Sequence, residues 1–149
     1  MTQFSFHSPI GELTLSEEEG KIVSLDWGWS PISQETAFLI RAKQLLDDYF
    51  DGLNPVFNIP LNPHGTDFQQ AVWQEMISIS YGKTKTYGEI AKKIHSHPRA
   101  VGTACGLNPI PIIIPCHRIM GQNGKLTGYS GGDGVETKEF LINLEKSTS

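Results

Sequence analysis

Cysteine is scarce in this chain, and long apolar runs are absent. The 149 residues include two cysteines, Cys105 and Cys116, which do not suggest a disulfide framework and favour a reducing, cytoplasmic location. No apolar stretch is long enough to span a bilayer, and residues 1–4 do not begin a secretory signal. Internal repeats and low-complexity tracts are also lacking. The sequence therefore predicts an ordinary cytoplasmic globular protein without membrane association.

Positive charge is in deficit overall, because the formal net charge is −4. Its distribution is uneven. Residues 1–75 carry eleven acidic and three basic side chains, for a net charge of −8, whereas residues 76–132 carry seven basic side chains against Glu89 alone, for +6. Like charges often form only a solvated surface, but an asymmetry of this size favours a polyanion as the partner of residues 76–132.

The first sixty residues have the patterns of a small sheet and one helix. Residues 12–16 alternate polar and apolar side chains, as a half-buried strand does, and residues 4–6 and 21–27 flank them as further strands. Apolar residues then recur at helical spacing over residues 34–50, with Ser33 before them as a capping candidate. These patterns predict a sheet of short strands followed by a helix.

A Pro- and Asn-rich stretch, residues 54–63, separates this part from the rest of the chain. We interpret it as a linker or an edge strand and place a domain boundary near residue 62. The predicted domains are therefore residues 1–62 and residues 63–149. Together they predict an α+β fold.

Thr66 begins the second part as a helix cap, because Gln69, three residues later, completes a capping-box pattern. Apolar residues follow at helical spacing, and Trp73 beside them is interpreted as a core residue. Residues 85–94 predict a second short helix and, after a turn, residues 100–107 predict a third. A short helix, a tight turn and a short helix are the helix-turn-helix arrangement. The apolar stripe of the first helix consists of Phe68, Val72, Met76 and Ile79.

Residues 112–119, Ile-Ile-Ile-Pro-Cys-His-Arg-Ile, combine a buried-strand pattern with reactive side chains. Three β-branched residues predict a strand, and Pro115 ends it so that Cys116 lies at the rim of the core. His117 is a candidate base and Arg118 a fixed positive charge, and both would favour the thiolate form of Cys116. However, adjacent side chains of a strand point to opposite faces, and a buried cysteine is usually inert. From these residues alone, a nucleophile and a packing residue both stay open.

Several short motifs, in one order, resemble those of the O6-alkylguanine-DNA alkyltransferases, also called methylated-DNA–protein-cysteine methyltransferases. Pro-Cys-His-Arg-Ile at residues 115–119 is similar to the active-site signature of that family, and Asn108-Pro109 precedes it at the family's spacing. Gly-Tyr-Ser-Gly-Gly at residues 128–132 matches the family's Gly-Tyr-x-Gly-Gly. The resemblance covers the whole chain and is closest from Gly65 to Glu145. Further matching segments lie at residues 8–11, 48–52, 65–69 and 71–73.

The resemblance implies a two-part architecture. The amino-terminal part would be a small ribonuclease H-like α/β domain with an antiparallel sheet. The carboxy-terminal part would be a winged-helix domain, which is a form of helix-turn-helix domain. The implied partner is double-stranded DNA containing O6-alkylguanine, bound by a monomer.

For residues 99–106, the resemblance implies DNA binding. The small side chains of this predicted helix suit close approach to a narrow surface better than reading of base edges, although small residues also serve helix packing. In the family this helix lies in the minor groove, and the arginine matched by Arg99 takes the place of the flipped nucleotide. Tyr87 matches the tyrosine that crowds the 3′ phosphate. The implied DNA contacts are Arg99, Ala100, Gly102, Thr103, Tyr87 and Arg118.

The resemblance also implies a base pocket. Asn108 matches the hinge between the DNA-binding helix and the active-site segment, with a turn residue as the simpler reading. Pro111 and residues 126–130 would line the guanine pocket. Within that segment, Tyr129 and Ser130 would supply walls and polar contacts.

For the reaction, the implied nucleophile is Cys116. In the family, the histidine matched by His117 reaches this cysteine through a water and is oriented by the carboxylate matched by Glu145, which is the logic of a catalytic triad. From the residues alone, Glu145 would be a solvated acid at a helix end. Tyr87 is a further candidate, as proton donor to the departing guanine. Because a thioether product is stable, each molecule would act once.

Some features depart from the family's pattern or concern other sites. The turn at residues 95–98 is shorter than in many relatives, and the loop between Gly132 and Lys138 is longer, so the match of Glu145 depends on that gap. Residues 1–104 lack cysteine, so we expect none of the zinc sites that some relatives carry. His95 and His97 are interpreted as exposed turn residues and Cys105 as a packing residue. We expect neither a metal nor a cofactor.

The leading hypothesis is single-turnover DNA repair by transfer of an alkyl group from the O6 of guanine, with O4-alkylthymine as a further substrate class, to Cys116. A non-catalytic protein of the same fold that binds alkylated bases and recruits other repair is the alternative, but such proteins have another residue at the cysteine position. A winged-helix transcription regulator would need a helix better suited to base readout. A cysteine hydrolase would need an oxyanion hole, which nothing in the sequence demands.

Overall fold

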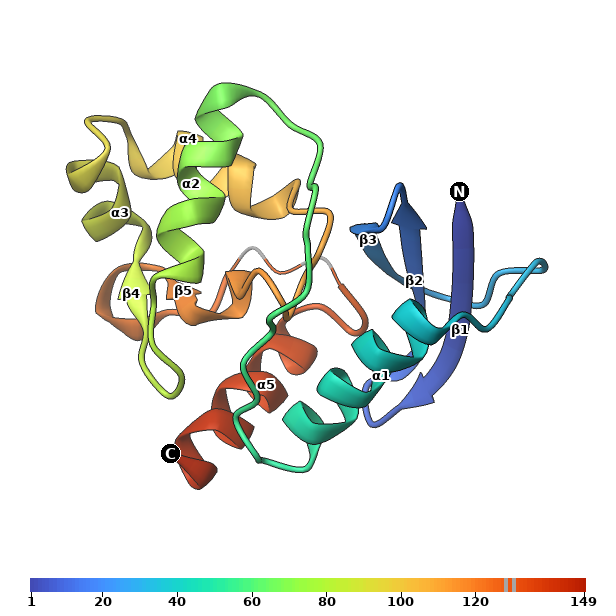
Figure 1. The fold of residues 1–149 in the computed structure, drawn as a ribbon. Helices are drawn as coiled ribbons and strands as arrows, with labels where there is room; N and C mark the ends of the chain where they lie inside the picture. Colours follow the sequence, from blue (N-terminus) through green and yellow to red (C-terminus); the bar gives the residue numbers. More distant parts are fainter. Residues whose placement is uncertain (128, 130) are drawn as a thin grey trace.

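The structure is a computed structural model that describes residues 1–127, 129 and 131–149. A three-stranded sheet and one helix form the first part, and a group of helices with a two-stranded sheet forms the second (Figure 1). The strands are β1 (Thr2–Ser8), β2 (Gly11–Glu18), β3 (Lys21–Trp27), β4 (Lys85–Thr86) and β5 (Ile119–Met120). The helices are α1 (Ala37–Phe50), α2 (Asp67–Ile77), α3 (Tyr87–Lys93), α4 (Pro98–Gly106) and α5 (Val135–Thr148). Two 3₁₀ turns lie at Cys116–Arg118 and Gln122–Gly124.

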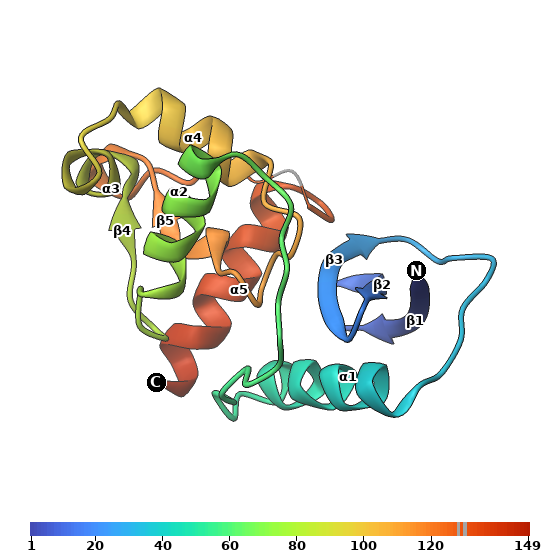
Figure 2. The same cartoon turned by 45° about the horizontal axis from the view of Figure 1, so that its top comes forward.

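The first three strands form an antiparallel sheet in the order β1-β2-β3, as their alternating patterns predicted. β1 and β2 pair from Thr2 opposite Glu17 to Ser8 opposite Gly11. α1 packs on one face of this sheet (Figures 1 and 2). The predicted amino-terminal arrangement of an antiparallel sheet and a helix is therefore confirmed.

α1 begins later than its spacing predicted, because Thr36 and not Ser33 caps it. The Thr36 hydroxyl accepts a hydrogen bond from the N–H of Leu39 at 3.1 Å. The hydroxyl of Ser33 instead accepts from the N–H of Ser5 in β1 at 2.9 Å. The predicted cap was wrong because the sheet uses Ser33, and a partner in β1 is invisible to a local pattern.

The stretch between α1 and α2 runs beside β3 before it reaches the second part. The N–H of Ile22 donates to the Pro60 carbonyl at 2.9 Å, and the N–H of Asn62 donates to the Ile22 carbonyl at 2.8 Å. This segment is therefore both a connection and a short piece of edge pairing. It covers part of the outer edge of β3.

Two helices of the second part begin with capping boxes. In α2, Thr66 and Gln69 cap each other's backbone N–H groups, as the sequence predicted, and in α3 Thr86 and Glu89 do the same. α4 begins with Pro98, a residue whose fixed φ suits the first position of a helix. α3 and α4 pack against each other, so the predicted helix, turn and helix are present.

Trp73 is buried, with 1% of its surface exposed, and its indole N–H donates to the Ala104 carbonyl at 2.9 Å. It therefore joins α2 to α4, which confirms its interpretation as a core residue. The predicted apolar stripe fails at Phe68, which is 38% exposed. Phe68 lies in the first turn of α2, ahead of the turns whose side chains are buried.

The strand predicted for the three isoleucines before Pro115 is wrong. Ile112 has a φ of 74°, and the chain folds into a turn closed by hydrogen bonds from Ile113 to Pro111 and from Ile114 to Ile110. Prolines on both sides remove the donors that a strand ladder needs. The isoleucines are nevertheless buried, so the apolar pattern predicted their burial correctly but not their backbone conformation.

The two parts share one hydrophobic core. Buried residues of the sheet and α1, such as Leu15 and Leu46, belong to the same cluster as Val72 of α2 and Leu141 of α5. Figure 2 shows α5 between the sheet side and the other helices. No helix in the described part of the chain combines the length and the apolar character needed to cross a membrane.

Candidate active site

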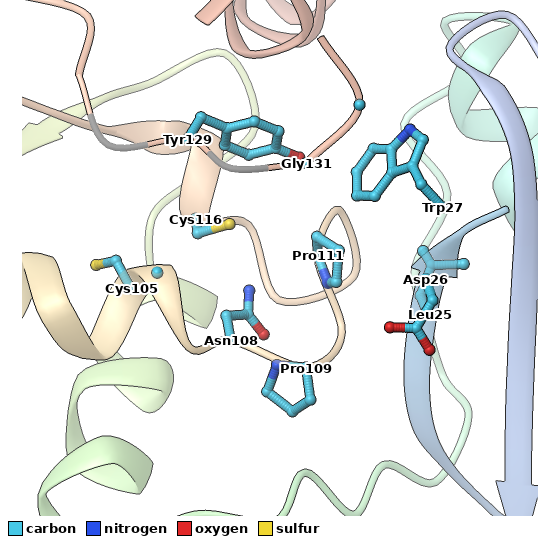
Figure 3. Close-up of a pocket in the computed structure, with 12 residues that line it drawn as sticks. Leu25, Asp26, Trp27, Cys105, Asn108, Pro109, Pro111, Cys116, Tyr129 and Gly131 are labelled. Atoms are coloured by element: carbon cyan, nitrogen blue, oxygen red, sulfur yellow. The ribbon is translucent and has the colours of Figure 1, made fainter. Parts of the chain in front are cut away.

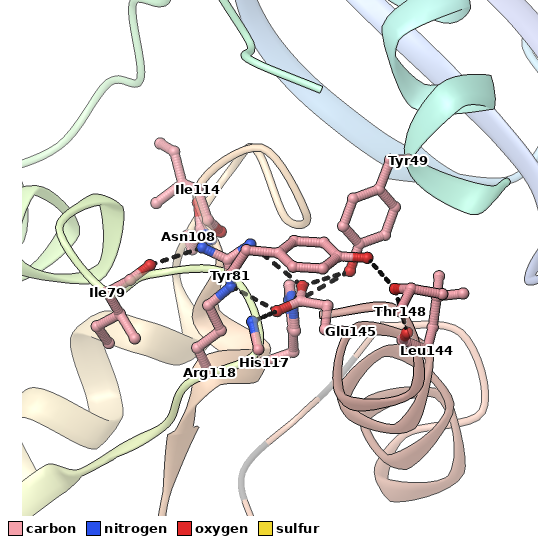
Figure 4. A network of polar contacts seen from close by, with 11 residues as sticks. Tyr49, Ile79, Tyr81, Asn108, Ile114, His117, Arg118, Leu144, Glu145 and Thr148 are labelled. Carbon is pink, nitrogen blue, oxygen red and sulfur yellow. Dashed lines mark hydrogen bonds and ion pairs between the residues drawn. The ribbon is translucent and has the colours of Figure 1, made fainter. Parts of the chain in front are cut away.

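A buried polar network lies where the end of α1, the Cys116–Arg118 turn and α5 meet (Figure 4). Glu145 of α5 is 2% exposed and forms its centre. One carboxylate oxygen accepts from Nε2 of His117 at 2.5 Å and from the Tyr49 hydroxyl at 2.6 Å. The other accepts from Nε of Arg118 at 2.8 Å and from the N–H of Gly82 at 3.1 Å. Glu145 is therefore a structural centre and not a solvated acid at a helix end.

The surroundings of Glu145 set its ionisation. Burial opposes the charged carboxylate, but the hydrogen bonds from His117, Arg118 and Tyr49, and the charge that His117 carries once it is protonated in acid, outweigh it and lower the pKa of Glu145 to about 2. Burial in turn lowers the pKa of His117, although Glu145 acts to raise it. At neutral pH the pair is therefore a carboxylate and an uncharged imidazole.

His117 is oriented by this network. Because Nε2 faces the Glu145 carboxylate, the neutral ring carries its proton there and leaves the Nδ1 lone pair free. Nδ1 is buried and has no hydrogen-bond partner among the described residues. An oriented, neutral imidazole with a free lone pair is suited to accept a proton from a neighbouring acid.

Cys116, at the start of the same 3₁₀ turn, lines a cavity of about 360 Å³ (Figure 3). The walls come from the end of α4, the segment that follows it, the end of β3 and the residues around Tyr129. Cys116 is 9% exposed, at the boundary between core and cavity. The lining residues are Leu25, Asp26, Trp27, Cys105, Gly106, Asn108, Pro109, Pro111, Cys116, Tyr129, Gly131 and Gly132.

The resting thiol of Cys116 is protonated. Burial raises the pKa of Cys116, and a hydrogen bond with Asn108 and the charge of Lys138 oppose that rise only in part. The expectation that His117 and Arg118 hold a thiolate is therefore wrong: His117 is neutral, and the Arg118 guanidinium is paired with Glu145. For Cys116 to act as a nucleophile, its thiol proton would have to be transferred to a base.

Asn108 connects α4 to the turn that carries Cys116. Its Nδ2 donates to the Ile114 carbonyl at 2.8 Å, and its Oδ1 accepts from the N–H of Ile110 at 3.0 Å. The amide therefore closes the segment between the end of α4 and the active-site turn. The same residue also lies on the cavity wall.

Tyr87, the first residue of α3, is half-buried beside the loop that follows β5. Its hydroxyl donates to the Thr127 carbonyl at 3.1 Å, and burial raises its pKa. The Lys138 Nζ donates to the same carbonyl at 2.9 Å and lies 5.6 Å from the centre of the Tyr87 ring. Tyr87 and Lys138 therefore form a second polar group near the cavity.

Sequence reasoning missed Lys138 and Tyr49. Lys138 is 1% exposed although lysine is almost never buried, and its position in an amphipathic helix gave no sign of this. Tyr49 falls at an apolar position of α1, so the helical spacing gave no sign of a polar role. Its partner Glu145 lies 96 residues away, and no local signal joins them.

The residues predicted to contact DNA separate into two groups. Arg99 and Thr103 are exposed on α4, and Ala100 and Gly102 are half-buried on the same helix. Arg118 does not join them: it is 12% exposed, and its NH1 donates to the Ile79 carbonyl at 2.7 Å while Nε pairs with Glu145. We therefore withdraw Arg118 as a DNA contact, because its guanidinium is held inside the network.

Other predicted residues are placed as follows. Pro111 and Tyr129 line the cavity, and the hydroxyl of Tyr129 is buried with no partner among the described residues. Ser130 lies outside the described residues. Cys105 is buried, with Sγ 3.8 Å from Sδ of Met76, and also reaches the cavity wall. Over residues 1–127, 129 and 131–149, no group of three side chains could hold a metal ion.

Two family models match the chain. The ribonuclease-like domain of 6-O-methylguanine DNA methyltransferase matches residues 4–63, and the DNA-binding domain of the same family matches residues 67–147. The chain is 46% identical over 152 residues to a methylated-DNA–protein-cysteine methyltransferase of Methanosarcina acetivorans, covering 95% of this chain and 96% of that protein. It is 43% identical over 152 residues to the constitutive protein of that name from Bacillus subtilis, covering 93% and 92%.

Solved structures agree with this similarity. A crystal structure of Mycobacterium tuberculosis OGT in complex with DNA matches with a TM-score of 0.90 and 41% identity, covering 100% of this chain and 95% of that one. The predicted α+β fold, with a ribonuclease-like first part and a helical DNA-binding second part, is therefore confirmed.

Proposed function

Because the chain belongs to the 6-O-methylguanine DNA methyltransferase family, we propose that it repairs DNA by moving an alkyl group from the O6 of guanine to Cys116. One observation carries the assignment of the acceptor. The Cys116 thiol lines a cavity of about 360 Å³ on the same short turn that carries the oriented, neutral His117. A cavity of this size lies in the range of small-molecule sites and suits a single extruded base.

The bonds and protons of the proposed reaction can be accounted for with side chains near the cavity and solvent. A bond forms between Sγ of Cys116 and the alkyl carbon while the bond from that carbon to O6 breaks. The thiol proton passes to Nδ1 of His117, directly or through a water, and the carboxylate of Glu145 stabilises the resulting imidazolium. The departing guanine takes a proton, for which the Tyr87 hydroxyl is the donor, and solvent then restores both side chains. Since the thioether is stable, one molecule transfers one group.

The proposed DNA-binding surface is the exposed side of α4. Arg99 is exposed at the start of that helix, and Gly102 and Ala100 allow the backbone to approach a narrow groove. Arg99 would enter the duplex in place of the extruded nucleotide, and Tyr87 would crowd the adjacent phosphate. The positive net charge of residues 76–132 supports this assignment. A DNA complex of the related Mycobacterium tuberculosis protein supports it too.

We propose further details on the same basis. Asn108 acts as the hinge, and Pro111, Tyr129 and Ser130 belong to the base pocket. Residues 1–62 and 63–149 are the two domains. A free, reactive thiol suits a reducing, cytoplasmic location. The non-catalytic alternative is not favoured, because Cys116 is present in the cavity.

The test is the intact mass of the protein after mixing with a short duplex that contains O6-methylguanine. We expect the mass of one methyl group to be gained in stoichiometric amount, to map to Cys116 and not Cys105, and to be absent in Cys116→Ser. Tight binding to the lesion without a mass change would instead favour the non-catalytic alternative. Absence of both would reject the proposed function.

A further inference from the structure

Trp27, the last residue of β3, lies in the sheet part of the molecule but lines the cavity that contains Cys116. Figure 3 shows its indole facing Pro111 and Gly131, while Cys105 of α4 lies on the opposite side of the cavity. The same indole lines a second hollow of about 530 Å³, between the β1–β2 turn and the start of α5. Trp27 therefore lies, together with Gly132, between two neighbouring spaces.

The indole is held firmly in this place. Its Nε1–H donates to the Ile10 carbonyl at 3.0 Å, and its ring meets Tyr129 edge-on, with ring centres 6.3 Å apart. The strand behind it is tied to the cavity wall as well, because the N–H of Leu25 donates to the Pro109 carbonyl at 2.9 Å. A wall fixed by these contacts has a defined position relative to the thiol.

Gly131 shows how closely the ring approaches the cavity wall. A Cβ added at Gly131 would lie 2.4 Å from Cζ3 of Trp27, and one at Gly132 would lie 2.9 Å from Nε1. The indole therefore occupies the space that a side chain at either position would need. At this end the cavity is closed by a residue from the sheet and by two glycines that make room for it.

We propose that Trp27 determines substrate specificity by limiting the size of the alkyl group that the cavity accepts. The inference rests on the proposed function. If DNA lies on α4, the base enters from the side of Cys105 and Asn108, and Trp27 stands at the far end. The reacting carbon must come within about 3–3.5 Å of the Cys116 sulfur. Whatever extends beyond that carbon must fit into the space that the base and the indole leave.

The simpler alternative is that Trp27 only holds the two parts of the molecule together. Loss of that contact would slow transfer of every alkyl group to a similar degree. A size limit predicts a different result, because removal of the indole joins the two hollows and favours large groups over small ones. The ratio of two transfer rates therefore separates the alternatives.

The experiment measures single-turnover transfer from duplexes containing O6-methylguanine or O6-benzylguanine, for the wild type and for Trp27→Phe, Trp27→Leu and Trp27→Ala. The expected result is a rise in the benzyl-to-methyl rate ratio as the side chain shrinks, reaching at least about tenfold in the smallest variant that folds. Trp29→Ala is the matched control. Trp29 lies two residues away, is 50% exposed and packs against His7, and it is not among the residues lining the cavity. The benzyl-to-methyl rate ratio of Trp29→Ala should therefore match that of the wild type.

An unchanged or falling ratio, with methyl transfer retained, would overturn the size limit and leave the proposed function intact. Trp27→Phe preserves a ring and guards against a failure of the smaller variants to fold. If Trp27→Phe alone folds, its ratio must exceed that of the wild type for the proposal to stand. Absence of methyl transfer by the wild type would instead reject the proposed function, and the size limit with it.

Discussion

The two sides of the Cys116–Arg118 turn differ sharply. On the cavity side, the Cys116 thiol lies among mainly aromatic, proline and glycine residues, with Asp26 as the one acidic lining residue, and burial raises its pKa. On the other side, His117 and Arg118 lie in a network centred on Glu145, whose carboxyl pKa falls to about 2. Neighbours in the sequence therefore occupy a largely apolar cavity wall and a network of paired charges.

The contrast supports the proposed function, in which the Cys116 thiol stays protonated until a substrate arrives. A 3₁₀ turn separates adjacent side chains by about 120°, so Cys116 and His117 can face different surroundings without a change of strand. The largely apolar cavity suits an uncharged base, and the ionic groups that would stabilise a proton on His117 lie on the other side of the turn. If this division is correct, damage to the network should impair the reaction more than damage to the cavity walls.

The largest effect is expected for Glu145→Gln, which removes the carboxylate at the centre of the charged network. The amide cannot compensate an imidazolium and leaves the Arg118 guanidinium without its anion. Transfer from O6-methylguanine should slow by at least about 100-fold, and the free energy of unfolding should fall by about 3 kcal/mol. Single-turnover rates and urea unfolding measure the two effects.

Glu139→Gln is the control for this substitution, because Glu139 is exposed on the same helix, α5. Its rate and stability should match the wild type. A Glu145→Gln variant that transfers methyl at the wild-type rate would show that the network has no part in activating Cys116.

Lowering the pH should remove the negative charge of Glu145 gradually, whereas Glu145→Gln removes it completely. The pKa of Glu145 is lowered from 4.5 to about 2 in the folded protein, so its contribution to stability is complete above pH 4.5 and is lost as the pH falls towards 2. Burial also lowers the pKa of His117, so its contribution is present above pH 6.5 and declines below it. Both effects have the same sign. Urea unfolding from pH 7 to pH 3 should show falling stability, with a shallower decline below pH 4.5 in Glu145→Gln; an equal slope would contradict the network.

The sequence predicted those features of the fold and of the site that depend on residues close together in the chain. The capping box at Thr66 and the alternation in β2 depend on residues a few positions apart, so local patterns indicated a helix start and a strand. Cys116 and His117 were found because they are adjacent and lie in a motif. Glu145 required the resemblance, since its own surroundings suggest a solvated acid.

What the sequence could not indicate depends on distant contacts. Ser33 pairs with β1, Tyr49 with α5, and Lys138 with the loop at Thr127, and each looked like an ordinary residue of its own segment. The segment around Ile112 was misjudged for another reason. A run of β-branched residues reports burial, and only the positions of the flanking prolines decide whether a strand can form.

A smaller effect is expected for Asn108→Ala, which loosens the connection between α4 and the turn that carries Cys116. The substitution leaves the Ile114 carbonyl and the Ile110 N–H without their partner. The free energy of unfolding should fall by about 2 kcal/mol, as measured in urea. Asn58→Ala is the control, because Asn58 is exposed and accepts one exposed hydrogen bond, from Arg41. Equal losses for the two variants would mean that Asn108 does not hold the active-site turn.

The smallest effect is expected for Lys138→Met, which tests whether a charge near the cavity influences the ionisation of Cys116. Lys138 lowers the pKa of Cys116 by its charge, but it is itself buried, and burial lowers its own pKa. Transfer should slow by up to about tenfold, the equivalent of one pKa unit, and the pH at which the rate rises should increase. Stability should not fall, because a buried charge is replaced by an apolar chain of similar length.

Lys146→Met, exposed on the same helix, is the control for Lys138→Met and should leave the pH–rate profile unchanged. An unchanged profile in Lys138→Met as well would mean that the charge near the thiol has no influence on its ionisation. Charges on the cavity side would then have no part in the activation of Cys116, which would depend on the His117–Glu145 pair alone. A loss as large as that of Glu145→Gln would reverse the comparison, because the charge on the cavity side would matter as much as the network behind it.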